Sequence, residues 1–591
     1  MRDKLTPISP RRVRLLPSMF QERFKLNRAY VMSLQNANLL QNYYLEAALE
    51  SFRQKPEDIH WGWEAPTCQL RGHFLGHWLS GAAQIYAATG DAEAKAKADA
   101  IVAELARCQQ ANGGEWAGSI PEKYLDRIVA GQRIWAPHYT LHKTLMGLYD
   151  MYALAGNDQA LEILINWARW FHRWTGQFSR EQMDDILDVE TGGMLEVWAN
   201  LYGVTGRAEH LELMRRYDRP RLFEPLLAGE DVLTNMHANT TIPEVLGAAR
   251  AFEVTGEPRW RAIVEAYWRS AVTERGYFAT GGQTCGEIWT PPFEQAARLG
   301  DKNQEHCTVY NMMLLADRLL RWTGDLSYAD YWERNLYNGV LAQQHKHTGM
   351  IAYFLPLEAG GVKKWGTPTD DFWCCHGTLV QAHALHNSAI YYEDAEGLLV
   401  SQYIPSELTW ERSGATVRVA QTADPQTGST RRPQARVVRL SVTSAEPAEF
   451  TLKLRLPDWL AGTPTILVNG EPAELQADSA RVVALRRAWR DDRIELVLPK
   501  RLSSYPLADR PDTVAFMDGP VVLAGLCDEE RALVGDKDEP QSILTPDNER
   551  EWTMWMTGYR THNQARNIRF LPLYEIVDQP YTVYFPVQPA G

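Results

Sequence analysis

The chain has 591 residues, of which 45% are apolar, and its 61 basic and 74 acidic side chains leave a net charge of −13. This length exceeds one ordinary domain and predicts roughly two to four. The sequence contains no long run of Lys or Arg and no segment near the ~18 consecutive apolar residues of a membrane helix, which argues against nucleic-acid and membrane partners.

The N-terminus, MRDKLTPISPRRVRLL, carries charges but no apolar stretch of signal-peptide length. A cytosolic location is therefore the simplest expectation, although a processed chain would look the same. The sequence leaves open whether the chain forms a homo-oligomer. The 21 tryptophans and 25 tyrosines suit the apolar faces of sugars, although most of these rings are expected in the core.

Amphipathic helices are expected from about residue 20 to 386, and a recurring phrase marks where they end. Each phrase follows an apolar run and supplies a glycine where a helix C-cap needs a positive φ. The phrases are YAATGD, YALAGND, YGVTGR, FEVTGE and LRWTGD, with Gly90, Gly156, Gly206, Gly256 and Gly324. Intervals of roughly 50 to 70 residues hold two helices each, which predicts six helical hairpins closed into an (α/α)6 barrel; an open α-solenoid is the alternative.

Counting back from each glycine gives the start of the same helix, where chemically capable side chains recur. In a closed barrel these starts would ring one mouth, with the positive ends of the helix dipoles pointing into it. The starts are Arg71-Gly72-His73, Pro137-His138 with His142, Gly192-Gly193 with Glu196, His237-Ala238-Asn239, Glu305-His306-Cys307 and Trp373-Cys374-Cys375-His376. Six such starts in register favour a shared pocket over coincidence.

After about residue 398 the pattern changes to short alternating segments separated by Gly, Pro and Asp turns, as a β-sandwich requires. The expected strands are 415–420, 437–444, 450–457, 465–470 and 493–499, and the tail 570–585 is expected to pair back into a sandwich. The predicted architecture is a multidomain α+β chain with an (α/α)6 barrel over residues 1–390 and one or two β-sandwiches over residues 391–591.

Four ligand-type residues form the strongest chemical pattern. Glu305-x-Cys307 and Cys374-Cys375 begin consecutive inner helices, so they can meet although they are far apart in the sequence. Three sulfurs and one carboxylate are enough to close a tetrahedral Zn²⁺ site. The alternative is that the thiols simply pack as small buried apolar groups.

A glycine-rich loop, TGGQTCGEIW, places Glu287 beside Trp289, just before the Glu305 helix. A glutamate in a partly apolar pocket has a raised pKa and can act as a general acid. The alternative is a solvated loop carboxylate.

The helix starts also supply candidates for sugar recognition. A neutral imidazole donates and accepts at once, which suits hydroxyl groups, so His73, His142 and His237 are candidate substrate-binding residues. Glu196 and Trp63 are expected at the same rim. For each histidine the alternative is a hydrogen-bonded structural role.

The runs EHCTVYNMMLLADRLLRWTGD and DFWCCHGT resemble glycoside hydrolase families 127 and 146, the β-L-arabinofuranosidases. The resemblance extends to WGWEAPTCQLRGHFLGHWLS, GGMLEVWANLYGVTG, LRLPDWLAGTPTILVNG and DGPVVLAG, and so covers most of the chain. It implies a retaining glycoside hydrolase with Cys374 as nucleophile and Glu287 as acid/base. It also implies zinc on Glu305, Cys307, Cys374 and Cys375, and a small-molecule or oligosaccharide substrate.

The resemblance departs after Thr378, where Leu379 and Gln381 are expected to reshape the sugar pocket. Two other classes of function compete with it. A sugar epimerase on the same barrel would use a histidine pair, for which His138 and His142 are available. A non-catalytic carbohydrate-binding protein would need no metal.

Overall fold

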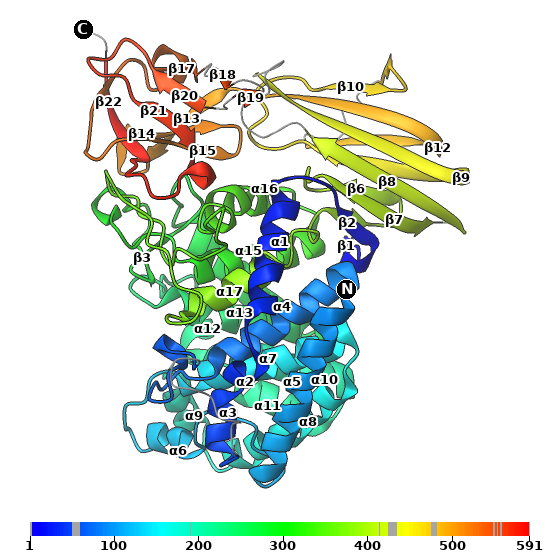
Figure 1. The fold of residues 1–591 in the computed structure, drawn as a ribbon, viewed down its shortest axis with the longest axis vertical. Coiled ribbons are helices and arrows are strands. Elements are labelled where there is room, and N and C mark those ends of the chain that lie inside the picture. Colours follow the sequence, from blue (N-terminus) through cyan, green and yellow to red (C-terminus); the bar gives the residue numbers. More distant parts are fainter. Residues whose placement is uncertain are drawn as a thin grey trace.

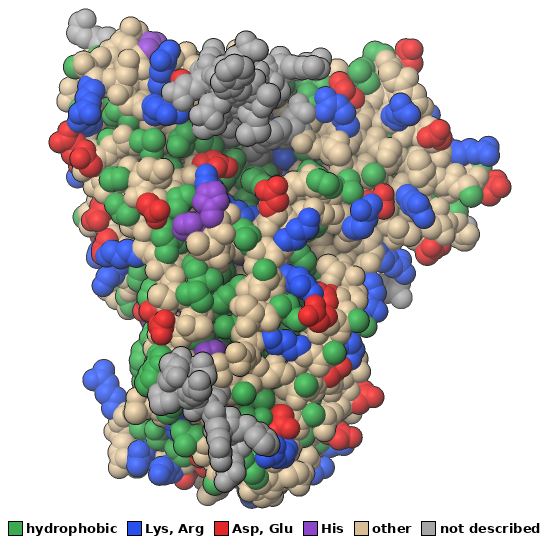
Figure 2. Space-filling model, in the orientation of Figure 1, with side chains coloured by type: hydrophobic (Ala, Val, Ile, Leu, Met, Phe, Trp, Pro, Cys, Tyr) green, Lys and Arg blue, Asp and Glu red, His purple; other side chains and the backbone are tan. Residues whose placement is uncertain are grey.

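The computed structural model describes residues 3–49, 59–189, 191–412, 414–423, 434–473, 481–547, 550–551, 554–555 and 558–589. The helices gather in one half of the molecule and the strands in the other (Figure 1). A search of the described helices for one of sufficient length and apolarity to cross a bilayer found none. On the face in Figure 2, basic and acidic side chains are interspersed over both halves.

Six inner helices begin at the starts expected from the sequence. They are α4 (His73–Thr89), α7 (Pro137–Ala155), α10 (Met194–Thr205), α13 (Ala238–Thr255), α15 (His306–Thr323) and α17 (Cys374–Ala382). All five predicted glycines cap the ends of the first five in the left-handed conformation. Each inner helix contacts the next, and α17 returns to contact α4, so the ring is a closed barrel and not an open solenoid.

Outer helices cover this ring because each presents one apolar stripe to its inner partner. On α8, for example, Ile163, Trp167, Phe171 and Trp174 are buried at helical spacing. The outer helices are α1 (Met19–Ser33), α5 (Ala92–Ala111), α8 (Asp158–Thr175), α11 (Ala208–Arg216), α14 (Pro258–Trp268) and α16 (Ser327–Asn335). Shorter helices in the connections are α2 (Asn36–Leu39), α3 (Gln41–Glu46), α6 (Lys123–Val129), α9 (Arg180–Leu187) and α12 (Pro220–Leu227).

Two glycines let α4 and α7 cross closely. A Cβ atom at Gly76 would lie 2.0 Å from the carbonyl of Lys143, and one at Gly147 would lie 2.4 Å from the carbonyl oxygen of Gly76. Any larger side chain at either position would force the two helices apart. This crossing fixes the separation of the helices that carry His73 and His142.

The first sheet is built on two long strands that pair along their length, β9 (Ala435–Arg455) and β12 (Val482–Pro499). The pairing is interrupted between Trp489 and Asp491, where the register shifts. The segments 437–444 and 450–457, expected as two strands, are thus one continuous strand. Further strands are β5 (Tyr391–Glu393), β6 (Gly397–Val400), β7 (Ser406–Arg412), β8 (Ala415–Ala423), β10 (Thr465–Val468) and β11 (Glu471–Pro472).

The N-terminal strands also belong to this sheet. Strand β1 (Thr6–Pro7) pairs with β5, and β2 (Val13–Leu15) pairs with β7. The sequence pattern assigns residues 1–390 to the helical barrel, so these strands correct the start of that assignment. Their residues alternate too briefly for a sequence pattern to distinguish them from a loop.

A second sheet follows, and the tail of the chain returns to it. Strand β22 (Tyr584–Gln588) pairs with β14 (Arg510–Asp518). The other strands are β13 (Leu502–Leu507), β15 (Val521–Gly525), β16 (Leu533–Val534), β17 (Leu544–Asp547), β20 (Gly558–Thr561) and β21 (Arg569–Pro572). Two separate hairpins are β3–β4 (Thr284–Cys285 and Ile288–Trp289) and β18–β19 (Arg550–Glu551 and Met554–Trp555).

Buried ion pairs join the barrel to the first sheet. Arg455 of β9 contacts Asp330 and Glu333 of α16, with 3.0 Å between Arg455 Nη2 and Glu333 Oε2. Arg481 makes a second contact with Asp330. Arg455, Asp330 and Glu333 are buried, whereas Arg481 is partly exposed. We call this set the junction network.

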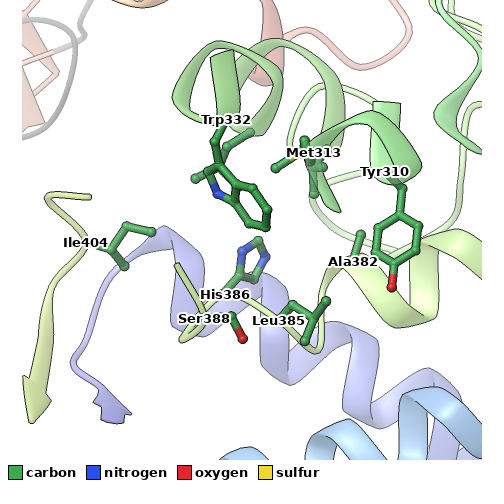
Figure 3. A pocket seen from close by; sticks show the side chains of 10 residues that line it. Tyr310, Met313, Trp332, Ala382, Leu385, His386, Ser388 and Ile404 are labelled. Carbon is green, nitrogen blue, oxygen red and sulfur yellow. The ribbon is translucent and has the colours of Figure 1, made fainter. Parts of the chain in front are cut away.

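A small cavity of about 20 Å³ lies where the end of α17 meets α15 and α16. His386 projects into it between Trp332, Met313 and Leu385 (Figure 3). His386 Nε2 lies 2.8 Å from His383 Nδ1, and its Nδ1 has no protein partner among the described residues.

Candidate active site

The four ligand-type residues meet at one mouth of the barrel. Glu305 is the N-cap of α15 and Cys307 lies in its first turn, while Cys374 and Cys375 are the first two residues of the neighbouring α17. Their four ligand atoms lie within 4.8 Å of one another, and all four residues are buried. We call them the cysteine cluster.

The spacing within the cluster suits a tetrahedral metal ion. The Sγ atoms of Cys307 and Cys375 are 3.4 Å apart, those of Cys374 and Cys375 are 3.9 Å apart, and Cys374 Sγ is 3.7 Å from Glu305 Oε1. Two donors each about 2.3 Å from a tetrahedral ion lie about 3.8 Å apart. The cluster could therefore hold a metal ion with little rearrangement.

Electrostatics also favour a cation in the cluster. Burial raises the pKa of Glu305, Cys307 and Cys375 well above their usual ranges. Burial acts in the same direction on Cys374, but hydrogen bonds with Cys307, Cys375 and Tyr353 outweigh it and hold the pKa of this thiol well below its usual range. Burial thus opposes ionisation of three of these four acids, and a divalent cation would favour release of their protons.

Glu287 lies at the tip of the β3–β4 hairpin. Gly286 and Glu287 both have positive φ, 60° and 68°, as a two-residue type I′ turn requires. Glutamate rarely adopts this conformation, and such outliers gather at functional sites. The carbonyl of Glu287 accepts a hydrogen bond from the backbone N–H of Ala238, which ties the hairpin to the start of α13.

One tyrosine joins this carboxylate to the cluster. The hydroxyl of Tyr353 donates to Glu287 Oε1 and lies 3.2 Å from Cys374 Sγ. Two atoms within hydrogen-bonding distance of one oxygen lie no more than about 6 Å apart. The carboxylates of retaining glycosidases are separated by about 5–5.5 Å, and the upper limit for Glu287 and Cys374 is compatible with that spacing.

Tyr353 is absent from the candidates that the sequence indicates. It lies in the long connection before α17, outside the helix starts that the repeat picks out. No periodicity or spacing in the sequence singles it out.

Two more of the predicted residues lie at this mouth. His237 is the N-cap of α13, and its Nε2 is 3.4 Å from Glu287 Oε2. Trp63 is half-buried and packs against the apolar cluster that contains the three cysteines, with its ring 6.5 Å from that of Tyr353. Both side chains can reach a ligand beside Glu287.

His73 is fully buried and hydrogen-bonded within the protein. Its Nε2 is 2.8 Å from the carbonyl oxygen of Phe372, and its Nδ1 is 3.3 Å from the hydroxyl of Tyr139. Burial lowers its pKa to about 4, so the ring is neutral. With both nitrogens engaged, His73 holds α4 and α7 to the loop before α17.

His142 and Glu196 lie deeper, in a cavity of about 210 Å³ along the barrel axis. Both ring nitrogens of His142 lack a partner among the described residues, and Glu196 Oε1 is 3.9 Å from Arg318 Nη2. Thr378 also lines this cavity, and its Oγ1 is 3.3 Å from Cys307 Sγ. One side chain therefore separates this axial cavity from the cysteine cluster.

The histidine pair of the epimerase alternative is not formed. His138 is buried with its Nε2 3.1 Å from the hydroxyl of Tyr217, whereas His142 faces the axial cavity. The two rings therefore occupy different surroundings and do not face one common substrate position.

Comparison with known families gives two matches along the chain. Residues 12–388 match the catalytic domain of the glycoside hydrolase family 127 β-L-arabinofuranosidases. Residues 397–500 match the middle domain of the same family.

Individual relatives agree with these matches. A non-reducing end β-L-arabinofuranosidase of Bifidobacterium longum subsp. longum is 26% identical over 526 residues, 75% of this chain and 74% of the relative. The solved structure of a family 127 β-L-arabinofuranosidase from Geobacillus stearothermophilus T6 is 18% identical and superposes with a TM-score of 0.70, covering 98% of this chain and 100% of that one. A second solved structure, of a family 127 β-arabinofuranosidase, is 17% identical and superposes with a TM-score of 0.74. The superposition covers 99% of this chain and 98% of that one. At these identities the structural likeness concerns the fold.

Proposed function

This chain belongs to the glycoside hydrolase family 127 β-L-arabinofuranosidases, and from that membership we propose a retaining mechanism in which Cys374 is the nucleophile and Glu287 the acid/base. The observation that carries the proposal is the hydroxyl of Tyr353, which lies within hydrogen-bonding distance of both side chains. A sulfur and a carboxylate held this close can act on the two sides of one anomeric carbon.

The metal in this proposal is Zn²⁺. Its ligands would be Glu305, Cys307, Cys374 and Cys375, whose three sulfurs and one oxygen form a donor set typical of zinc. When bound, zinc would keep the sulfur of Cys374 ionised near neutral pH.

The first step transfers the sugar to the protein. The Cys374 sulfur attacks the anomeric carbon and forms a C–S bond as the C–O bond to the leaving group breaks. Glu287 gives its proton to the departing oxygen. The product is a glycosyl thioether on Cys374.

The second step returns the sugar to water. Glu287, now ionised, takes a proton from a water molecule, whose oxygen attacks the anomeric carbon and breaks the C–S bond. Two inversions give net retention. Tyr353 and His237 orient the carboxylate of Glu287 through the contacts described above.

Product stereochemistry tests the proposal most directly. Proton NMR of a β-L-arabinofuranoside digest should show the β-anomer first. The matched variant Cys374→Ser should lose turnover by at least about a thousandfold, because a serine hydroxyl is a far poorer nucleophile than a thiolate. Initial release of the α-anomer would exclude Cys374 as nucleophile.

Glu287→Gln separates the acid role from the base role. Substrates with poor leaving groups should suffer most, because they need proton donation in the first step. With a nitrophenyl glycoside the thioether should instead accumulate, as a mass increase on the Cys374 peptide. An equal loss on good and poor leaving groups would remove Glu287 from the acid role.

A further inference from the structure

Two tryptophans stand out because they are exposed. Among the tryptophans whose side chains the structure describes, Trp61 and Trp135 have large exposed surfaces, 45% and 48% of each residue, while the others are buried or half-buried. Leaving an indole in water forgoes a large part of its burial free energy. A single exposed apolar side chain is ordinary on a protein surface, so the case for a ligand contact depends on what surrounds Trp135.

Trp135 lies directly outside the candidate active site. Its ring packs edge-on against Trp63, with centroids 5.0 Å apart, and Trp63 in turn lies 6.5 Å from Tyr353. Tyr353 contacts Glu287 and Cys374. A continuous line of aromatic rings therefore leads from the reacting groups to the surface.

The local backbone holds Trp135 in place. Its N–H donates to the Gln69 side chain at 2.7 Å, and the next residue, Ala136, has a left-handed conformation with φ of 42° just before Pro137 begins α7. Proline fixes its own backbone and restricts the residue before it. The backbone is thus held on both sides of Trp135, and its indole packs against Trp63, so binding would cost little ordering entropy.

We propose that Trp135, supported by Trp63, is a platform for the sugar ring of the leaving group. The inference rests on the proposed function, because it assigns the cleaved residue to the pocket of Cys374 and Glu287. The leaving oxygen would depart on the side of Glu287, and Trp135 precedes the start of α7, one of the helix starts that surround this mouth. Indole presents a flat apolar face with one polar edge, which matches the C–H face and hydroxyl rim of a sugar.

This platform selects substrates by the group attached beyond the cleaved bond. A leaving group with a sugar ring gains contact with Trp135, whereas a methyl group is too small to cover the indole. Binding energy from this remote contact also helps to position the reacting bond. The enzyme is therefore suited to oligosaccharides over simple alkyl glycosides.

The test compares two substrates that share the cleaved sugar, methyl β-L-arabinofuranoside and a β-L-arabinofuranosyl disaccharide. For Trp135→Ala, the ratio of kcat/KM for the disaccharide to that for the methyl glycoside should fall about tenfold, equivalent to about 1.4 kcal/mol. Trp135→Phe, which keeps a flat ring, should recover most of the ratio. The control Val534→Ala removes an exposed apolar side chain from the second sheet and should leave the ratio unchanged.

An unchanged ratio in Trp135→Ala would overturn the platform. A binding measurement distinguishes failure of the platform from failure of the proposed function. If the wild-type protein cleaves neither glycoside, the proposed function is wrong, and the disaccharide is titrated calorimetrically into Glu287→Gln and Glu287→Gln/Trp135→Ala. A Kd about tenfold weaker in the double variant would support the platform. Equal affinities, or no binding to either protein, would overturn it.

Discussion

The cysteine cluster and the junction network both bury carboxylate groups, but they differ in the groups that surround those carboxylates. Glu305 and Glu333 are each only 1% exposed. Glu333 and Asp330 face Arg455, which belongs to the same chain and is buried with them. Glu305 instead faces three thiols, which are themselves acids. The junction network has arginines of the same chain beside its carboxylates. The cysteine cluster has only other acids as its metal-ligand-type neighbours.

This difference separates a structural centre from a chemical one. Removing a charge from water costs several kcal/mol, and a buried partner of opposite sign offsets most of that cost. The junction network has its partner built in and can hold two domains together. The cysteine cluster has no arginine or lysine among its four ligand-type residues, so joint ionisation of its acids would require a bound cation. Buried acids without a counter-charge are therefore the better signal of function.

The largest expected effect comes from opening the cysteine cluster. Cys307→Ala should lower the metal content from one zinc per chain to nearly none, measured by elemental analysis. Turnover should fall by at least about 100-fold, since even outer contacts of a metal site can contribute that much. Cys108→Ala, which removes a buried thiol from α5, is the matched control and should keep the metal. If Cys307→Ala kept one zinc per chain, the cysteine cluster would not be the zinc site, and its proposed difference from the junction network would be wrong.

Breaking the junction network should affect stability and not chemistry. Arg455→Met leaves Asp330 and Glu333 buried without their main partner, and the free energy of unfolding should fall by about 3–5 kcal/mol. Zinc content should stay at one per chain. In the same sheet, Arg486 forms an exposed pair with Glu449, and Arg486→Ala should cost less than about 1 kcal/mol. Denaturant titration measures the free energy of unfolding of both variants. Equal losses in Arg455→Met and Arg486→Ala would show that burial does not determine how much each ion pair stabilises the protein.

The axial cavity gives a smaller effect that depends on pH. Burial raises the pKa of Asp150 from 3.8 to about 7, whereas the unfolded chain keeps the ordinary value. The folded protein therefore binds an extra proton between these values, and this contribution to stability is lost as pH rises from about 4 to about 7. An asparagine at this position cannot ionise, so the Asp150→Asn variant does not lose stability in this way as pH rises. The free energy of unfolding of the variant minus that of the wild type should therefore increase by about 1–3 kcal/mol from pH 5 to pH 8.

Thermal melts at several pH values check this prediction. Asp185→Asn is the control, because Asp185 is exposed and pairs with Arg221 on the surface. Its difference from wild type should vary little with pH. A pH-independent difference for Asp150→Asn would mean that Asp150 stays ionised inside the cavity.

The sequence predicted those parts of the fold that depend on local signals. A glycine such as Gly206 ends a helix through its own backbone freedom, so the capped repeat located the inner helices. Glu305, Cys307, Cys374 and Cys375 came together because they begin two of these helices.

Contacts made by irregular segments could not be predicted in the same way. Tyr353 reaches Glu287 from a long connection, and Trp135 sits just before α7 beside a loop from elsewhere in the chain. His142 and Glu196 occupy the expected helix starts, but their side chains line the axial cavity. A repeat gives the position of a residue along a helix, and only packing decides which cavity its side chain enters.

The pairing of β1 with β5 has a consequence for how the protein is made. Thr6 lies opposite Glu393, so β1 waits for its partner while the whole barrel is synthesised. At roughly 5–20 residues per second this delay is on the order of tens of seconds. Throughout that time β1 and β2 are unpaired edges that can join another nascent chain. The pairing of β1 and β2 with the first sheet is thus a late, long-range event in folding.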